Sequence, residues 1–221
     1  MTVWRRSPVY PLCLLVGALL FGSAGLAHPL LTGDGPTQLA VIAGTPAWRT
    51  IHWALLFGLP LMFAGLIGLA LRHAGTPGDV AARAGALLAT LGFGGWMLNV
   101  LFMVGAGGQL ARAYATADPG LTATQAIFVY DMLHPFGLAA ERVATFTVGF
   151  ALYAYGWGIR NGQVYPRWLG WLGIAIGATA AAVAVVFTEF SLNMFYAQAL
   201  VVVWFAVVGA LMLRDVRARM T

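Results

Sequence analysis

Six apolar runs, each long enough to cross a membrane as a helix, divide most of this chain. A helix needs about 20 apolar residues to cross about 30 Å of hydrocarbon. Only 9% of the residues are charged and 61% are hydrophobic, whereas about 25% of a soluble domain is charged. The sequence therefore predicts an all-α, polytopic membrane protein in contact with the lipid bilayer, a six-transmembrane-helix bundle with short loops that forms one domain over residues 1–221. We expect the spans at about residues 10–27, 51–71, 84–105, 136–159, 168–188 and 192–213.

The basic residues predict the orientation of this bundle. All twelve are Arg, and a cytoplasmic N-terminus would leave nine inside and two outside. Such a bias in short loops favours the arrangement with the positive side in the cytoplasm. We therefore expect a multi-pass protein of the bacterial cytoplasmic (inner) membrane with both termini in the cytoplasm. The net charge of +5 then reflects topology and predicts no nucleic-acid partner.

The first apolar run has a second interpretation, because it also resembles a secretory signal. Arg5 and Arg6 precede it, and Gly25-Leu26-Ala27 has the small-x-small pattern of a cleavage site. Its length of about 18 residues exceeds the 7–15 of a usual signal core. We expect the span to be retained. The single Cys13 excludes an intramolecular disulfide and a paired thiolate metal site.

Polar residues from four spans reach the same predicted face of the membrane. His28 ends the first span, His52 opens the second, His134 opens the fourth and Glu189 closes the fifth, all on the outer side. Asp131 precedes His134 at a similar level. An ionisable side chain at mid-span costs about 2.5–3.5 kcal/mol on insertion scales, so such groups mark candidate functional sites.

The segment that enters the fourth span carries most of this charge. At 100° per residue, Asp131, His134, Glu141 and Arg142 fall within a sector of about 100° of one helix. Alternatively the helix starts at Pro135 and leaves Asp131 in a separate segment. Glu141 lies about 8 Å below the interface, at 1.5 Å per residue. Because adjacent residues on a helix do not face each other, we expect Glu141 and Arg142 to pair with other helices or with water.

Two kinds of role remain open for these residues. In the first, Glu141 and Arg142 make polar contacts between helices and the histidines cap helix ends, while Asn99, Asn193 and Gln198 donate interhelical hydrogen bonds. In the second, they form a ligand site. Imidazoles at matched height suit haem b or a divalent metal, and His28 or His52 with His134 would supply the axial ligands of a haem. The chain contains no HExxH or CxxC motif and no pair of histidines four residues apart.

A motif near the fifth span suggests a family. The run from Tyr165 to Gly173, with the sequence Tyr-Pro-Arg-Trp-Leu-Gly-Trp-Leu-Gly, resembles a loop-to-helix signature of uncharacterised six-helix bacterial integral membrane proteins, grouped as a domain of unknown function. His28-Pro29 and His52 are also similar to that group. The resemblance implies a six-helix bundle in a bacterial inner membrane and implies no activity.

Three functions follow as hypotheses. The leading one is a membrane protein with a polar site near the outer face that binds a small apolar ligand, haem or a metal, with candidate ligands His28, His52, Asp131, His134, Glu141, Arg142 and Glu189. The second is a non-catalytic accessory or assembly subunit of a larger membrane complex. The third is a membrane enzyme that acts on an isoprenoid or lipid, in which burial keeps Glu141 neutral as a general acid.

Overall fold

The computed structural model describes residues 7–116, 120–188 and 190–218, and these residues form helices joined by short connections, without a strand. The predicted all-α fold is confirmed. The helices are α2 (Val9–Ala27), α3 (Gly35–Ala43), α4 (Trp48–His73), α5 (Asp79–Phe102), the π-helix η1 (Met103–Gly107), α6 (Gly108–Ala115), α7 (Ala123–Gly162), α8 (Arg167–Val186) and α9 (Leu192–Ala218).

Five helical segments of the described chain are long and apolar enough to cross a membrane, so the protein is a multi-pass membrane protein. They are α2, α4, the continuous run of α5, η1 and α6, α8, and α9. The sixth expected span, residues 136–159, is the second part of α7, whose hydropathy is lowered by Glu141 and Arg142. At 1.5 Å per residue the 40 residues of α7 extend about 60 Å, about twice the thickness of the hydrocarbon core.

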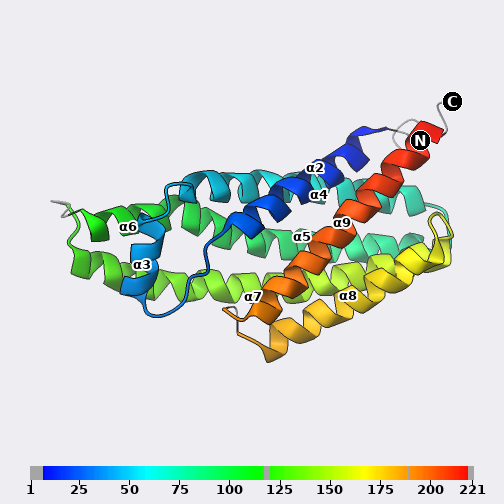
Figure 1. Cartoon of the computed structure of the whole chain (residues 1–221). Coiled ribbons are helices and arrows are strands. Elements are labelled where there is room, and N and C mark those ends of the chain that lie inside the picture. Colours follow the sequence, from blue (N-terminus) through cyan, green and yellow to red (C-terminus); the bar gives the residue numbers. More distant parts are fainter. Residues whose placement is uncertain (1–6, 117–119, 189, 219–221) are drawn as a thin grey trace.

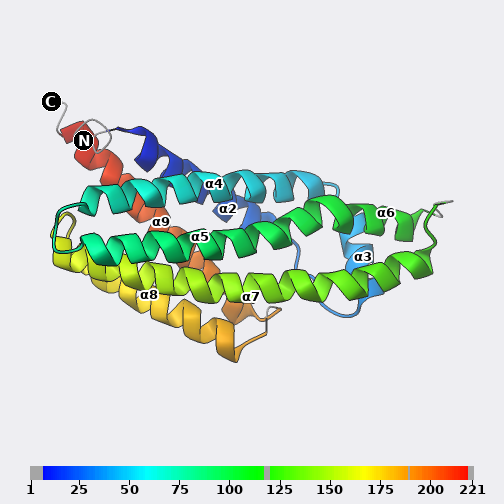
Figure 2. The ribbon, with the colours of Figure 1, turned by 180° about the vertical axis from the view of Figure 1, so that it is seen from behind.

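The six long helices form a closed ring of neighbours. Helix α2 packs on α4, α4 on α5, α5 on α7, α7 on α8, α8 on α9, and α9 back on α2. In Figure 2, α4, α5, α7 and α8 run side by side, and in Figure 1 α2 and α9 cross obliquely in front of them. Each helix therefore contacts two others, and all six helices border the space inside the ring.

The two ends of the bundle differ in charge and in structure. The first and last described helices begin and end at the same end of the molecule, where the α4–α5 and α7–α8 connections also lie (Figure 1). This end carries most of the described arginines: Arg72, Arg83, Arg160, Arg167, Arg214 and Arg217. At the opposite end, α3, α6 and the first part of α7 bury a second apolar cluster around Leu39, Leu110 and Tyr130. We refer to this second cluster and its helices as the outer cluster.

Close helix contact in the bundle depends on glycine. On α7 and α8 two pairs of glycines face each other: a Cβ at Gly177 would lie 2.4 Å from the carbonyl oxygen of Gly149, and one at Gly170 would lie 2.6 Å from that of Gly156. Small residues allow this approach, which helix association in lipid requires. Gly173 adjoins the Trp204 indole, whose Nε1 donates to the Leu169 carbonyl oxygen at 3.2 Å. The Trp-Leu-Gly-Trp-Leu-Gly motif thus packs α8 against α7 and α9.

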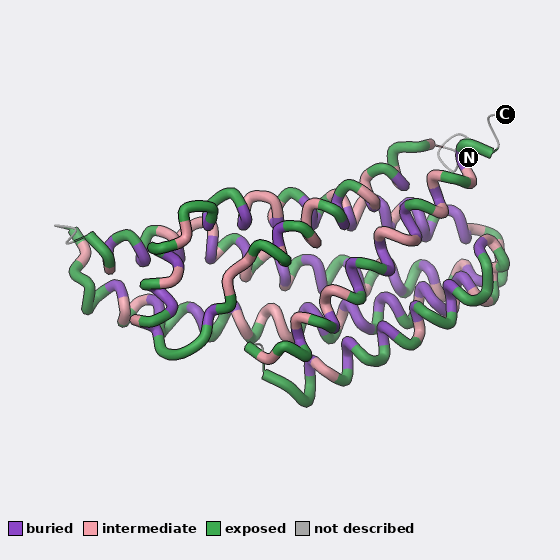
Figure 3. The backbone as a smooth tube through the Cα atoms, viewed as in Figure 1, coloured by how far each residue is buried: buried purple, intermediate pink, exposed green. Residues whose placement is uncertain are grey.

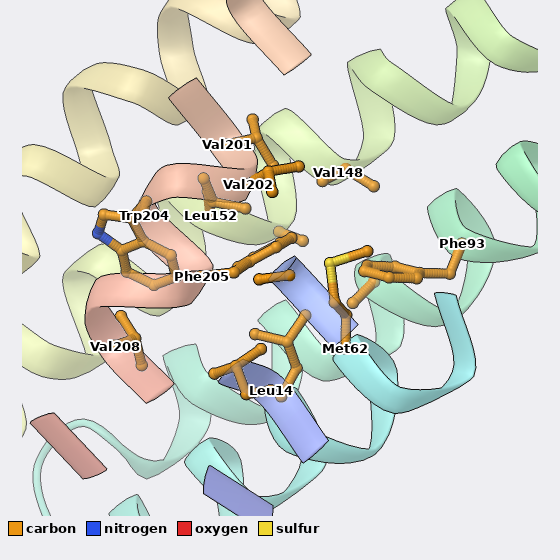
Figure 4. Packing of buried hydrophobic residues seen from close by; sticks show 14 of the residues in the cluster. Leu14, Met62, Phe93, Val148, Leu152, Val201, Val202, Trp204, Phe205 and Val208 are labelled. Atoms are coloured by element: carbon orange, nitrogen blue, oxygen red, sulfur yellow. The ribbon is translucent and has the colours of Figure 1, made fainter. Parts of the chain in front are cut away.

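The core of the ring consists of large side chains that point inward from several helices. Figure 4 shows Leu14, Met62, Phe93, Leu152 and Phe205 meeting between α2, α4, α5, α7 and α9. Buried residues follow the inward faces of the helices and exposed ones the outward faces (Figure 3). The outward positions are themselves apolar, which is the surface that lipid requires.

The helix boundaries correct two expectations. Helix α5 continues through η1 into α6, so the third span does not end near residue 105. Helix α7 is continuous through Pro135, and the alternative in which the helix starts at that proline is wrong. Its true start is a capping box in which the Thr122 hydroxyl accepts from the Gln125 amide N–H and the Gln125 side chain accepts from the Thr122 amide N–H.

Candidate functional site

A pocket of about 380 Å³ opens inside the ring, on the side towards the outer cluster. Its walls come from α2, α4, α5, α7, α9 and the connections that follow α2 and α8. Four of the predicted site residues line it: His28, His52, His134 and Glu141. Asp131 and Arg142 lie outside its lining, and Glu189 lies outside the described residues. The rest of the wall is mainly apolar and includes Phe21, Leu55, Trp96, Leu138, Phe195 and Val202.

Glu141 is held by amide groups from two other helices. Its Oε2 accepts a hydrogen bond from Asn99 Nδ2 of α5 at 2.7 Å, and its Oε1 accepts one from Gln198 Nε2 of α9 at 2.9 Å. Gln198 Nε2 also donates to the Thr145 hydroxyl at 3.0 Å, which accepts from Trp96 Nε1 at 3.2 Å. We call these five residues the Glu141 cluster. The Glu141 carboxylate therefore connects α7 to α5 and α9.

Arg142 points to a different neighbour. Its Nε and Nη2 donate to the Ala184 carbonyl oxygen at 3.3 Å and 3.2 Å, and Nη2 also lies 3.4 Å from the Val185 carbonyl oxygen. These oxygens belong to the last turn of α8, where carbonyls lack helical partners and a cation is favoured. Arg142 therefore joins α7 to the end of α8, as the structural interpretation expected.

Asp131 faces the outer cluster. Its side chain is exposed and lies against the first residue of α3, where a Cβ at Gly35 would overlap the carboxylate. The N-terminal end of a helix attracts negative charge. Asp131 thus lies at the start of α3 and away from the pocket.

His28 and His52 contact each other directly at the edge of the pocket. Their Nε2 atoms are 3.2 Å apart, and their ring centroids are 4.9 Å apart, so the rings meet through their Nε2 edges. The Nδ1 of His28 donates to the Pro29 carbonyl oxygen at 2.7 Å, and that of His52 donates to the Trp48 carbonyl oxygen at 2.8 Å. Burial lowers the pKa of His28 below its ordinary value, although the hydrogen bond to Pro29 partly offsets this effect.

Trp48 covers this histidine pair. Its ring centroid lies 4.1 Å from that of His52 and 5.1 Å from that of His28. Its Nε1 donates to the Met103 carbonyl oxygen at 3.3 Å, at the start of the π-helix η1. A π-helical turn changes the hydrogen-bond pattern of the helix at this point, and such turns are frequent at functional sites.

His134 lies on α7, in an aromatic part of the pocket wall. Its ring centroid is 4.6 Å from that of Tyr130, 6.0 Å from that of Phe102 and 6.3 Å from that of Phe190. The three histidines at matched height therefore divide into a contacting pair and a third ring among aromatic residues. Within the described ranges, no three side chains of His, Cys, Asp or Glu gather as a metal-binding group.

Several pocket residues lay beyond the predicted site. Asn99 and Gln198 were expected as interhelical donors, and they are, but nothing in the sequence pointed to Glu141 as their shared acceptor. Trp48 was not among the predicted site residues, and its contact with the histidines depends on tertiary packing. Trp48 and His52 are four residues apart on α4, which is the one local signal that pairs them.

Comparison with protein-family models, with curated proteins and with solved structures finds no match to this chain. The function is therefore argued from the geometry of the pocket.

Proposed function

We propose that this multi-pass membrane protein binds a small, predominantly apolar molecule in the pocket, with a hydrogen-bond donor of that molecule on Glu141. The observation that carries the proposal is the pocket itself: about 380 Å³, walled mainly by apolar and aromatic side chains, with the carboxylate of Glu141 in its lining. Apolar pockets with a few polar groups that fix orientation are typical of small-molecule sites.

The chemistry of Glu141 supports a ligand that donates a hydrogen bond. An ionised carboxylate only accepts, and Asn99 and Gln198 each give it one N–H. A hydroxyl or amine of the ligand would be a suitable donor to the same carboxylate. The general-acid role of Glu141 in an isoprenoid or lipid enzyme stays a prediction.

The walls of the pocket support entry from the bilayer. Leu26 of α2 and Val203 of α9 both line the pocket, and they are 78% and 57% exposed. Helices α2 and α9 are neighbours in the ring, so these exposed apolar side chains support an opening between them. An apolar molecule dissolved in the membrane would meet this opening first.

The contact between His28 and His52 does not fit a haem held between these two rings. A bis-histidine haem requires two imidazoles separated by the porphyrin, whereas the two Nε2 atoms are 3.2 Å apart. The other axial pair, His28 or His52 with His134, stays a prediction. An apolar ligand needs no such separation. The accessory-subunit role remains the alternative.

We also propose the bacterial cytoplasmic membrane as the location, with the end where α2 begins and α9 ends facing the cytoplasm. The supporting observation is the separation of arginines between the two ends of the bundle.

Two glycines provide a matched test of the ligand proposal. A Cβ at Gly25 or at Gly94 would meet no atom within 4 Å, but Gly25 lines the pocket and Gly94 faces outward from α5. Gly25→Leu fills the pocket, and Gly94→Leu adds the same side chain on the lipid side. Native mass spectrometry of the detergent-purified proteins should show a bound small molecule in the wild type and in Gly94→Leu, and its loss in Gly25→Leu. A wild type without any bound small molecule, even after incubation with membrane lipid extract, would refute the proposal.

A further inference from the structure

The contact between His28 and His52 poses an electrostatic problem that the apolar ligand does not solve. Their Nε2 atoms are 3.2 Å apart, and His52 is 2% exposed. The partner of each Nδ1 is a backbone carbonyl oxygen, which only accepts hydrogen bonds. Each Nδ1 must therefore carry the proton, and in two neutral imidazoles both Nε2 atoms then present lone pairs to each other.

A cation shared by the two Nε2 atoms removes this repulsion. One candidate is a proton, which would make one ring an imidazolium whose Nε2 donates to the other ring. The other candidate is a metal ion. Metal-binding histidines almost always donate their second N–H to a backbone carbonyl or carboxylate, which fixes the ring and the tautomer. Both histidines already make this bond.

We propose that His28 and His52 bind one Cu⁺ ion through their Nε2 atoms at the edge of the pocket. Two metal–imidazole bonds of about 2.0–2.1 Å that meet at about 100–110° hold their nitrogens about 3.1–3.4 Å apart. The observed separation of 3.2 Å falls in this range. The pair therefore accepts a tetrahedral ion with little movement of either ring, and the remaining ligand positions face the pocket or its water.

Charge and ligand type select Cu⁺ over Zn²⁺. Imidazoles are neutral ligands, and His52 is buried while His28 is half-buried. The energy of burying an ion rises with the square of its charge, so a monovalent ion costs about a quarter as much as a divalent one. Within the described residues no third His, Cys, Asp or Glu joins the pair as a metal ligand. The thioethers of Met103 and Met194 line the same pocket, and soft sulfur ligands favour Cu⁺.

Helix α4 provides a matched control for this site. His52 and His73 are both buried, and the Nδ1 of each donates to the carbonyl oxygen four residues earlier, of Trp48 and of Leu69. Only His52 faces another imidazole. His73→Gln therefore removes a buried histidine with the same local bond at the opposite end of the helix, without touching the proposed site.

The test is anaerobic competition for Cu⁺ held by bathocuproine disulfonate, whose absorbance falls as the purified protein withdraws the ion. We expect one Cu⁺ per chain in the wild type and in His73→Gln. His28→Gln and His52→Gln should each weaken binding by more than about 100-fold, since loss of a ligand should exceed the 10–100-fold effect of a ligand's hydrogen-bond partner. Cu⁺ should also raise the apparent Tm of the wild type and of His73→Gln, and leave that of His52→Gln unchanged.

Three results would overturn the assignment. These are a wild type that withdraws no Cu⁺, histidine variants that bind it as tightly as the wild type, and a wild type that is stabilised by Zn²⁺ but not by Cu⁺. Because the wild-type Tm shift does not depend on any substitution, a variant that fails to fold leaves the proposal open to refutation. The Cu⁺ titration and the mass spectrometry of the apolar ligand are separate measurements, so a wild type that keeps a bound small molecule but withdraws no Cu⁺ refutes this proposal alone.

Discussion

The hydrogen bonds of Glu141 lead to a quantitative prediction about how α7 and α9 are held together. Glu141→Ala removes the acceptor of Asn99 Nδ2 and one of the two acceptors of Gln198 Nε2. Polar contacts between membrane helices average about 0.6 kcal/mol and reach about 1.7 kcal/mol. A charged acceptor strengthens a hydrogen bond by roughly a factor of two. We therefore expect Glu141→Ala to lower the free energy of unfolding by about 2–3 kcal/mol.

A double-mutant cycle between Glu141 and Gln198 isolates one of these bonds. With a distance of 2.9 Å and an ionised acceptor, the expected coupling energy is about 1–2 kcal/mol. The measurement is the unfolding of Glu141→Ala, Gln198→Ala and the double variant in mixed micelles as the SDS fraction rises, followed by tryptophan fluorescence. Gln198 keeps its bond to the Thr145 hydroxyl when Glu141 is absent, so the cycle reports the carboxylate contact alone.

The control cycle pairs Glu141 with Gln38. Gln38 is buried, whereas Gln198 is half-buried, and the Gln38 side chain bonds the Gly33 carbonyl oxygen and the Tyr130 hydroxyl in the outer cluster. Its coupling with Glu141 should be zero within about 0.3–0.5 kcal/mol. A coupling between Glu141 and Gln198 no stronger than that between Glu141 and Gln38 would show that the Glu141 cluster does not hold the pocket walls together. The magnitude worked from the hydrogen bonds of Glu141 would then be wrong.

Three further predictions concern other parts of the fold. Gly177→Leu should destabilise the protein by at least about 1–3 kcal/mol in the same unfolding assay, because even its Cβ would lie 2.4 Å from a backbone oxygen of α7, and a wild-type result would refute the close contact of α7 with α8. Asp215→Ala should lower the free energy of unfolding by about 3 kcal/mol, since it leaves the Arg72 guanidinium, whose side chain is 6% exposed, without its carboxylate at 2.8 Å; retention of stability would show that the pair contributes little. Hydrogen bonds from the Thr37 hydroxyl and amide N–H lower the pKa of Asp34 in the folded protein. The Asp34 cap therefore stabilises α3 at pH values above the unfolded-state pKa of about 3.9, and this stabilisation is lost as the pH falls through the lower folded-state pKa. Hydrogen exchange of the α3 amides should therefore differ between wild type and Asp34→Ala at pH 6 and converge below about pH 3, and an equal difference at both pH values would contradict this reasoning.

Apolar runs located the membrane helices because lipid exposure demands apolar residues on every outward position. They could not locate the ends of helices that continue beyond the membrane. Helix α5 runs on through η1 into α6, where the sequence becomes more polar while the backbone stays helical. Pro135 suggested a helix start, yet the proline removes only one backbone hydrogen bond, and α7 continues through it. Hydropathy indicates whether a segment faces lipid or water, whereas the ends of these helices depend on capping and packing.

The contacts of the candidate site could not be predicted from the sequence. His28, His52 and His134 were expected at one level of the membrane, which stays a prediction, and all three line the same pocket. The contact between two of these histidines depends on the extended backbone of His28 after α2, with φ −72° and ψ 125°. Hydrophobic periodicity does not encode this backbone conformation. On α7 a sector of about 100° was treated as one face. Glu141 and Arg142 are themselves 100° apart on a helix, and that angle is enough for one to meet α5 and α9 and the other α8.

The outer cluster has a role in the site that the sequence could not suggest. Trp48 belongs to this cluster and lies over both histidines, while its indole N–H is fixed by the Met103 carbonyl oxygen, 55 residues away in the chain. Without α3, α6 and the first part of α7 around it, Trp48 would be an exposed residue at the start of α4, and His52 would face water. The outer cluster therefore covers His52, which is 2% exposed, while His28 stays half-buried at the edge of the pocket. In such low-dielectric surroundings a polar atom needs a partner, so the contact between the two Nε2 atoms matters most for His52.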